Sequence, residues 1–184
     1  FEFEIEPEEW AALQQDCVEY KEEYRPIVFL YGDESQDAMI RLKGYWSWIC
    51  EKLQFVVSFN EVDPDARFHG LRKIVLDAPW YDPTLLHERM AMDILARSGA
   101  QYSCVNNALL YVNGEYYGVY ANVERIDHEY LERHFEEHDG NLYKAGVELK
   151  TNEETADTSD RDAFWAATDL EALAAIVDLD QAVA

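Results

Sequence analysis

The chain has 184 residues, 48 % of them apolar and 14 % aromatic, which is enough to build the core of one ordinary domain or of one domain with an extension. Its 38 Asp and Glu outnumber its 15 Lys and Arg, so the formal net charge is −23. This charge repels phosphate backbones and anionic headgroups, which disfavours nucleic acid and membrane surfaces as partners. No apolar run approaches the ~20 residues of a membrane span. A phosphorylated ligand would need a local positive pocket or bound metal ions.

One helix and four strands are expected in the first 80 residues. Apolar residues recur every three or four positions over residues 7–24, which predicts an amphipathic helix with an acidic outer face. Residues 26–44 read as two strands around the turn-rich GDESQD. A third strand is expected at 52–62, where Phe side chains alternate onto one face, and a fourth, short strand is expected at 72–77.

The next element has the clearest helix signals of the chain. Asp82 can cap free backbone N–H groups, Pro83 suits the first helical position and Gly99 suits the end, which predicts a helix over 83–98. Its residues are apolar almost all round, so we expect this helix to be buried on most sides.

A hairpin is expected next. Asn113-Gly114 favours a type I′ turn, because both residues tolerate positive φ, and it would join 108–112 to 115–123 in antiparallel register. An acidic helix at 127–138 and a short strand at 140–146 follow, then an acidic linker from about 151 and a helical stretch at 164–184. The whole predicts an α+β domain with a mostly antiparallel sheet, one packed helix and flanking helices.

The chain has three cysteines, Cys17, Cys50 and Cys104, with no CxxC spacing. An odd number without that spacing disfavours a tetrahedral zinc site. Two alternatives stay open: three buried thiols, which the packing habits of cysteine favour, or one disulfide with one thiol left over.

Glu88 is the most notable candidate residue. On a helical wheel it falls inside the apolar arc of the helix over 83–98. A carboxylate there loses hydration and needs a partner. The preceding strands supply Lys43, Lys52 and Lys73, and kinases hold the phosphates of a nucleotide with such a strand lysine paired to a helix glutamate. The alternative is that Glu88 reaches solvent or pairs with a neighbouring arginine, Arg72 or Arg89.

Other chemical signals are weak. A turn at 44–47 could contact phosphate, but it matches neither a GxGxxG nor a GxxxxGK[ST] pattern, and a plain hairpin turn is the alternative. The acids at 157–162 and 178–180 do not fit the EF-hand spacing. Histidines lack the HExxH spacing, and no GxSxG is present. We therefore predict no catalytic nucleophile and no metal site formed by the chain alone.

Several segments, taken in order, resemble the CotH family of spore-coat-protein-H-like atypical protein kinases. They run from about residue 38 to 146 and read IRLKGYWSW, KLQFVVSFNE, FHGLRKIVLDAPWYDPTLLHERMAMDIL, NALLYVNGEYYGVYANVERIDHEYLERHF and GNLYKAG. The resemblance implies an amino-terminal kinase-like lobe over 38–150, preceded by a helix and a strand in 1–37 and followed at 151–184 by an acidic linker and the start of a second lobe.

The resemblance also implies a nucleotide site. Glu88 would be the ion-pairing glutamate, and Lys52 or Lys73 the phosphate-contacting lysine, with Lys52 preferred. Glu124 would lie in the connector to the second lobe, beside the adenine. The implied ligands are ATP with Mg²⁺ or Mn²⁺ and a Ser/Thr-containing secreted or coat protein, which would favour a secreted or cell-envelope location.

The family pattern continues with a second lobe that carries the catalytic and metal-binding aspartates, which we do not transfer to Asp178 or Asp180. Because the present sequence stops where that lobe begins, we expect this piece to be inactive alone and its full-length parent to be the kinase. An apolar face left open by the missing lobe would favour self-association. A non-catalytic binding or surface-assembly module that keeps the fold is the alternative function.

Overall fold

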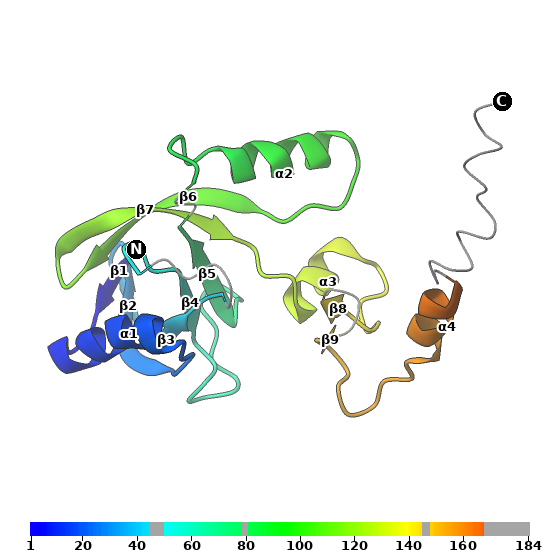
Figure 1. Cartoon of the computed structure of the whole chain (residues 1–184), viewed down its shortest axis with the longest axis horizontal. Helices are drawn as coiled ribbons and strands as arrows, with labels where there is room; N and C mark the ends of the chain where they lie inside the picture. The colour runs from blue at the N-terminus through cyan, green and yellow to red at the C-terminus, as the bar shows by residue number, and fades with distance from the viewer. Residues whose placement is uncertain (45–49, 79–80, 145–147, 168–184) are drawn as a thin grey trace. The chain divides into compact units, whose positions relative to one another are not determined.

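The computed structural model describes residues 1–44, 50–78, 81–144 and 148–167 (Figure 1). The chain divides into two compact units, residues 1–134 and 135–184. The predicted turn at 44–47, most of the helix predicted at 164–184 and the acids at 178–180 lie outside the described residues.

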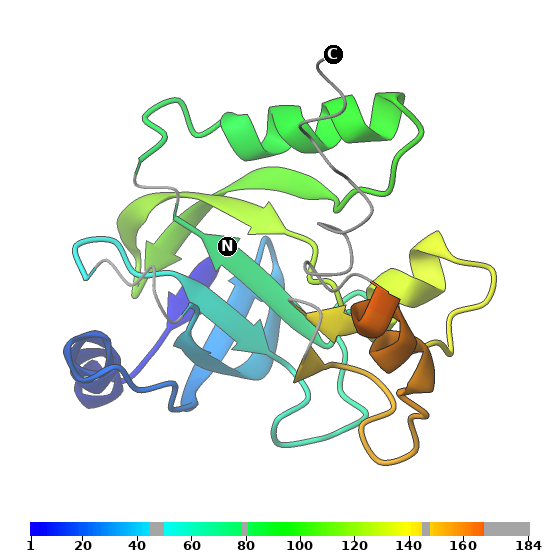
Figure 2. The same ribbon diagram turned by 45° about the vertical axis from the view of Figure 1, so that its right-hand side comes forward.

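The first unit is a closed barrel of seven strands in the order β1–β2–β3–β4–β5–β7–β6 (Figure 2). Their bounds are β1 Glu2–Glu4, β2 Arg25–Tyr31, β3 Glu34–Leu42, β4 Phe55–Ser58, β5 Lys73–Asp77, β6 Val105–Val112 and β7 Glu115–Val123. All neighbouring strands pair antiparallel except β1 and β6, which are parallel.

The expected α+β fold, a kinase-like amino-terminal lobe with one packed helix, is therefore wrong. The structure is mostly β, its barrel is closed, and its helices are few and short. The barrel closes because of β1. Its residues pair with β2 on one side and with β6 on the other, which joins the two edges of the sheet and closes the barrel. The FEFEI alternation at the start of the sequence is the strand signal that was missed.

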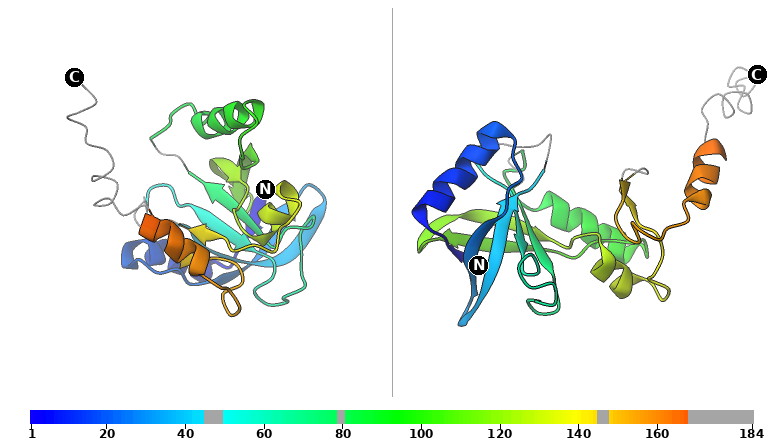
Figure 3. Two further views of the ribbon diagram at one scale, coloured as in Figure 1. Left: turned by 90° about the vertical axis from the view of Figure 1, so that its right-hand side faces the viewer. Right: turned by 90° about the horizontal axis from the view of Figure 1, so that it is seen from below.

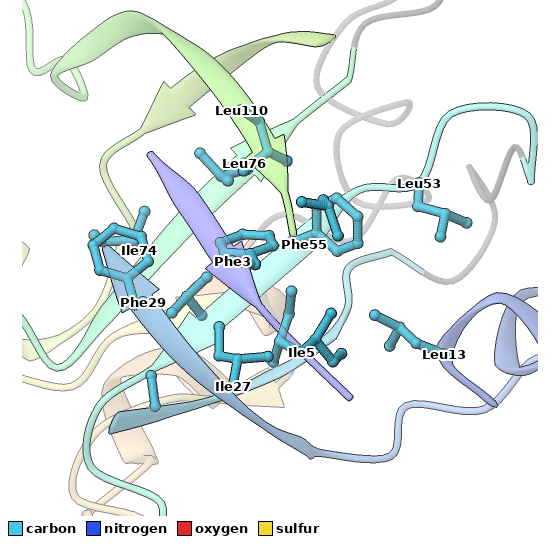
Figure 4. Packing of buried hydrophobic residues seen from close by; sticks show 14 of the residues in the cluster. Phe3, Ile5, Leu13, Ile27, Phe29, Leu53, Phe55, Ile74, Leu76 and Leu110 are labelled. Carbon is cyan, nitrogen blue, oxygen red and sulfur yellow. The ribbon is translucent and has the colours of Figure 1, made fainter. Parts of the chain in front are cut away.

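Aliphatic and aromatic side chains together fill the barrel (Figure 4). Phe3, Phe29 and Phe55 are fully buried, and the rings of Phe3 and Phe55 meet edge to face with centroids 5.6 Å apart. Tyr120 is also fully buried, and its hydroxyl donates a hydrogen bond to the Leu53 carbonyl oxygen at 2.9 Å. Burial of each such ring contributes about 1.5–3 kcal/mol to stability, so the core holds the unit together.

Helix α1 (Pro7–Glu19) is anchored to the barrel. Leu13, Asp16 and Cys17 are its buried residues. The Arg25 guanidinium donates two hydrogen bonds of 2.9 Å to the Asp16 carboxylate, one from Nε and one from Nη2, which compensates the buried charge. A disulfide joins Cys17 to Cys50 and Cys104 is free, so the alternative with one disulfide is the correct one.

Helix α2 (His87–Arg97) is shorter than expected and has no buried residue. The Asp82 carboxylate still accepts a hydrogen bond from the His87 N–H at 2.9 Å, but residues 83–86 form a turn before the helix starts. Gly99, with φ of 75°, follows the helix end as predicted. The expectation of a helix buried on most sides is wrong. The helix runs beside the β6–β7 hairpin (Figure 2), and three of its apolar side chains, Met90, Ile94 and Leu95, are exposed.

The hairpin of β6 and β7 forms as the sequence predicts. Asn113 and Gly114 have φ values of 50° and 82°, the positive values of a type I′ turn. The Asn113 side chain also donates to the Ile5 carbonyl at 2.9 Å and accepts from the Ile5 N–H at 2.8 Å. The turn thus fixes the end of the β1 segment to the hairpin.

A short helix, α3 (His128–His134), completes the first unit. The second unit contains a small antiparallel pair, β8 (Tyr143–Lys144) and β9 (Glu148–Leu149), and helix α4 (Ser159–Ala167). Among the described helices, none is both long and apolar enough to cross a membrane.

Candidate functional site

The predicted nucleotide-binding residues divide between the two ends of β5. Lys52 and Glu88 lie near the Asp77 end of the strand, while Lys73 begins the strand and Glu124 follows its neighbour β7. Five residues at about 3.3 Å each separate these ends by roughly 13 Å. The structure therefore does not gather all four residues: Lys52 and Glu88 belong to one end of the strand, and Lys73 and Glu124 to the other. Among the described residues, no ion pair joins Lys52 to Glu88.

The Asp77 end gathers three charged side chains from three elements. The Lys43 ammonium, just after β3, donates to the Asp77 carboxylate. Glu88 on α2 is half-buried, and its pKa is raised first by burial and then by the negative charge of Asp77, while the Lys43 charge acts to lower it. Glu88 makes no ion pair within 4.0 Å to any described residue, so it faces the Lys43–Asp77 pair without closing on either lysine that the sequence favoured.

Lys52 is a half-buried cation at the same end. Its ammonium donates to the Val119 carbonyl oxygen at 2.9 Å and lies 5.1 Å from the centroid of the Tyr120 ring. Gly118 makes room for it, because a Cβ there would stand 3.7 Å from the Lys52 Cε. Burial lowers the pKa of Lys52, and no carboxylate of the described residues is in ion-pair distance of it. Lys52 is thus a partly desolvated cation without a counter-ion among the residues that the structure describes.

Lys73 is already paired. Its ammonium lies 2.7 Å from Glu61 Oε1 and donates to the Tyr24 hydroxyl at 3.1 Å, with the Tyr24 ring centroid 5.4 Å away. Glu61 occupies the place that Glu88 would take in the expected ion pair.

Glu124 is buried among positive and donor groups, with its side chain 7 % exposed. Its Oε2 accepts a hydrogen bond from the Cys104 N–H at 2.8 Å and stands 3.3 Å from His134 Nε2. Its Oε1 lies 2.7 Å from Arg133 Nη1, yet no N–H points at it, so it has a charge partner but accepts no hydrogen bond within the described part of the chain. A buried acceptor in this state can take a further donor.

A cavity of about 110 Å³ adjoins Glu124 in the first unit. Its charged lining includes Arg72, Lys73, Arg125 and Arg133 with Glu124, Asp127 and Glu129. Arg72 pairs with Glu129, and this pairing holds the pKa of Glu129 at about 2 against the effect of burial. Burial, followed by the neighbouring Glu129 carboxylate, raises the pKa of Asp127 to about 6.

Sequence reasoning missed Asp77, Arg125 and Arg133. It named Lys43 without choosing it, and it named Arg72 only as a possible partner of Glu88, whereas Arg72 pairs with Glu129. Two features of the sequence could have identified the Lys43–Asp77 pair: Asp77 ends the apolar run KIVLD, and Lys43 lies between an apolar strand and a glycine. No linear spacing connects them. In the described ranges, no three His, Cys, Asp or Glu side chains converge in a way that would hold a metal ion unaided.

Comparison with known proteins gives the family. The model of the family described as CotH kinase protein matches residues 40–175, well over half of the chain. The inner spore coat protein H of Bacillus subtilis (strain 168) is 25 % identical over 127 residues, which cover 69 % of this chain and 34 % of that protein. The matched part thus spans about a third of the length of this curated relative. The match over 40–175 shows that the chain belongs to the CotH family.

Proposed function

We propose that this chain takes part in ATP-dependent phosphoryl transfer to Ser or Thr of secreted or coat proteins, as part of a full-length parent protein. Membership of the CotH family, whose description names a kinase, supports this proposal. The observation that carries it is the group of Lys43, Asp77 and Glu88 at one end of β5. The partly buried ammonium of Lys52 lies at the same end and has no ion-pair partner among the described residues.

The charges at the Asp77 end suit a polyphosphate with its metal ion. A phosphate would supply the counter-charge that Lys52 lacks and would restore its pKa. Glu88 would orient the Lys43 ammonium, as a helix glutamate orients the phosphate-binding lysine of kinases. Mg²⁺ and Mn²⁺ prefer oxygen ligands and bind nucleotides through one or two carboxylates, which Asp77 and Glu88 could provide.

Lys73 and Glu124 have a secondary place in this proposal. Lys73 keeps Glu61 as its partner, so Lys52 is the stronger candidate for the phosphate contact. The Glu124 side chain is directed to its own ion pairs, and its backbone N–H donates to the Cys104 carbonyl at 2.7 Å. Any contact to the adenine of ATP would therefore use the backbone carbonyl groups of the residues that follow β7.

The test is transfer of the ATP γ-phosphate by the full-length parent, assayed with Mn²⁺ and a Ser/Thr protein acceptor. We expect Glu88→Gln to lower the rate by about 100-fold or more, because one preorganised charge at the reacting phosphates is worth that much. Circular dichroism and the melting temperature should stay unchanged. Asp93→Asn on the same helix, at an exposed position, is the matched control and should keep full activity. Wild-type activity of the Glu88 variant would remove that residue from the mechanism.

A second candidate function is a non-catalytic binding or surface-assembly module. The exposed apolar side chains of α2, Met90 and Ile94 in particular, favour it, because large exposed apolar residues often mark contact surfaces. If the full-length parent neither binds ATP nor transfers phosphate, this second function stands in place of the first.

A further inference from the structure

We propose that the cavity beside Glu124 is a binding site for a single phosphate group, separate from the charges at the Asp77 end of β5. Its occupant would be inorganic phosphate or a phosphorylated serine of a protein. None of the residues assigned to the phosphates at the Asp77 end lines this cavity, which shares with the proposed function only Lys73 and Glu124.

Positive side chains are concentrated here in an otherwise acidic protein. The Lys73 ammonium does not count here, because its partner Glu61 does not line the cavity. Three carboxylates, Glu124, Asp127 and Glu129, line the same space. The cations of the lining are Arg72, Arg125 and Arg133, in a chain of net charge −23. They come from the start of β5, from the segment after β7 and from α3, so the barrel and the following helix hold them around one space. Such an acidic surface repels phosphate elsewhere, which makes a local cluster of cations selective.

The arginines have hydrogen-bond donors to spare. Each guanidinium carries five N–H groups. Arg72 uses Nε and Nη2 on Glu129, which leaves Nη1. Arg125 has its Nε 3.4 Å from Asp127 Oδ2 and makes no hydrogen bond to the described residues. This excess of N–H donors around one cavity suits the acceptor oxygens of a phosphate, to which arginine binds in a bidentate way.

The carboxylates of the lining fit a phosphate that carries a proton. Glu124 Oε1 is buried and accepts no hydrogen bond, so it offers an acceptor to a P–OH group. A phosphate monoester loses its second proton near pH 6, and its monoanion has one such group. Asp127, whose pKa is raised to about 6, gives up negative charge in the same range and so frees Arg125. The protonated phosphate thus offers one P–OH donor as well as acceptor oxygens, whereas sulfate offers acceptor oxygens only.

The size of the cavity agrees with a single phosphoryl group. About 110 Å³ accommodates several water molecules, and therefore one phosphate, but not a whole nucleotide. Cys104, the free cysteine of the chain, lines the same cavity and is exposed. Its thiol provides a reporter at the site, because a bound ligand would hinder its alkylation.

The experiment measures alkylation of Cys104 by iodoacetamide in the 184-residue chain at pH 6, together with calorimetric titration. The added probes are inorganic phosphate, a blocked phosphoserine peptide, its unphosphorylated form and sulfate. We expect phosphate or phosphoserine to slow the alkylation and to bind measurably, and we expect the unphosphorylated peptide and sulfate to do neither. Protection by the phosphoserine peptide alone would assign the site to phosphorylated proteins. Equal protection by this peptide and by inorganic phosphate would assign the site to the small ion.

Arg125→Gln should weaken this binding about tenfold, because it removes one charge-assisted donor pair. Arg97→Gln, which makes the same charge change at an exposed position of α2, should have no effect. Both variants should keep the wild-type circular dichroism spectrum. The proposal is overturned if no probe protects Cys104, if sulfate protects it as well as phosphate, or if the two variants lose affinity equally.

Discussion

Helices α1 and α2 lie on opposite sides of the same barrel and differ in how they are held (Figures 1 and 3). Helix α1 buries three residues and is fixed by an ion pair and a disulfide. Helix α2 buries none, and Met90 and Ile94 are 58 % and 63 % exposed. Stability is therefore concentrated in the barrel and α1, whereas the element that carries Glu88 is attached by few contacts.

This difference has a functional meaning. Elements that rearrange around ligands belong to the less stable part of a protein, with few buried apolar contacts. The segment before α2 is held by hydrogen bonds to Asp82 and by the Asn107 amide, which donates to the Leu85 carbonyl at 2.8 Å. We expect α2 to exchange its backbone amide hydrogens faster than α1.

The largest contrast should appear on truncation of apolar side chains. Phe55→Ala in the core should lower the free energy of unfolding by about 3–5 kcal/mol, because it leaves a cavity in contact with Phe3, Trp10 and Tyr120. Ile94→Ala on α2 should change it by less than about 0.5 kcal/mol. Urea denaturation of both variants checks the comparison, and a large loss for Ile94→Ala would show that α2 is packed after all.

A second contrast concerns ion pairs. Arg25→Ala leaves the Asp16 carboxylate buried without its partner and should cost about 3 kcal/mol. Arg97→Ala breaks the exposed pair with Asp93 on α2 and should cost less than about 0.5 kcal/mol. The same denaturation experiment applies, and similar costs for the two pairs would contradict the view that only α1 is anchored.

The smallest effect is expected at α3. Burial raises the pKa of Asp127 to about 6, above the ~3.9 of the unfolded chain, so the folded state binds the extra proton. Wild-type stability should thus rise as the pH falls from 7 to 5, by about 1–2 kcal/mol relative to Asp127→Asn. In the wild type, Asp127 Oδ1 accepts a hydrogen bond from the Glu129 N–H at 3.2 Å. The asparagine of the variant keeps an oxygen that can accept the same hydrogen bond.

The titration of Glu129 lies outside the pH range of this stability measurement. Its pKa is lowered to about 2, so its contribution is lost only as the pH falls below about 4.5. Glu129 interacts with Asp127, so the comparison is made between pH 5 and 7, where Glu129 is ionised in both proteins. Groups remote from Asp127 are common to both proteins and cancel in the difference. Identical pH dependence of the two melting curves would show that Asp127 titrates normally.

Local signals predicted the local structure well. The Asn113-Gly114 turn and the helix end at Gly99 follow from backbone preferences that act within a few residues. Barrel closure could not be deduced in this way, since it depends on Glu2 and Phe3 meeting Tyr111 and Val112, more than a hundred residues away. The apolar composition of α2 indicated burial, but only tertiary contacts decide what covers a helix.

The candidate site was predictable residue by residue but not as a geometry. Glu88 was identified because a carboxylate in an apolar arc is unusual, and the structure places it half-buried near Lys43 and Asp77. Its partner was not predictable from spacing, because three lysines on or next to neighbouring strands satisfy the same pattern. Lys73 can be excluded as the partner of Glu88 only because it pairs with Glu61, and that pairing depends on the fold of the loop after β4.

Barrel closure by β1 has a consequence for handling this protein. Three residues, Glu2–Glu4, cover the hydrogen-bonding edges of both β2 and β6. A protease that removes them would leave two strands with unpaired N–H and C=O groups and would expose the core around Phe29. Uncovered strand edges pair readily with other chains, so such a trimmed form should aggregate although most of its sequence is intact.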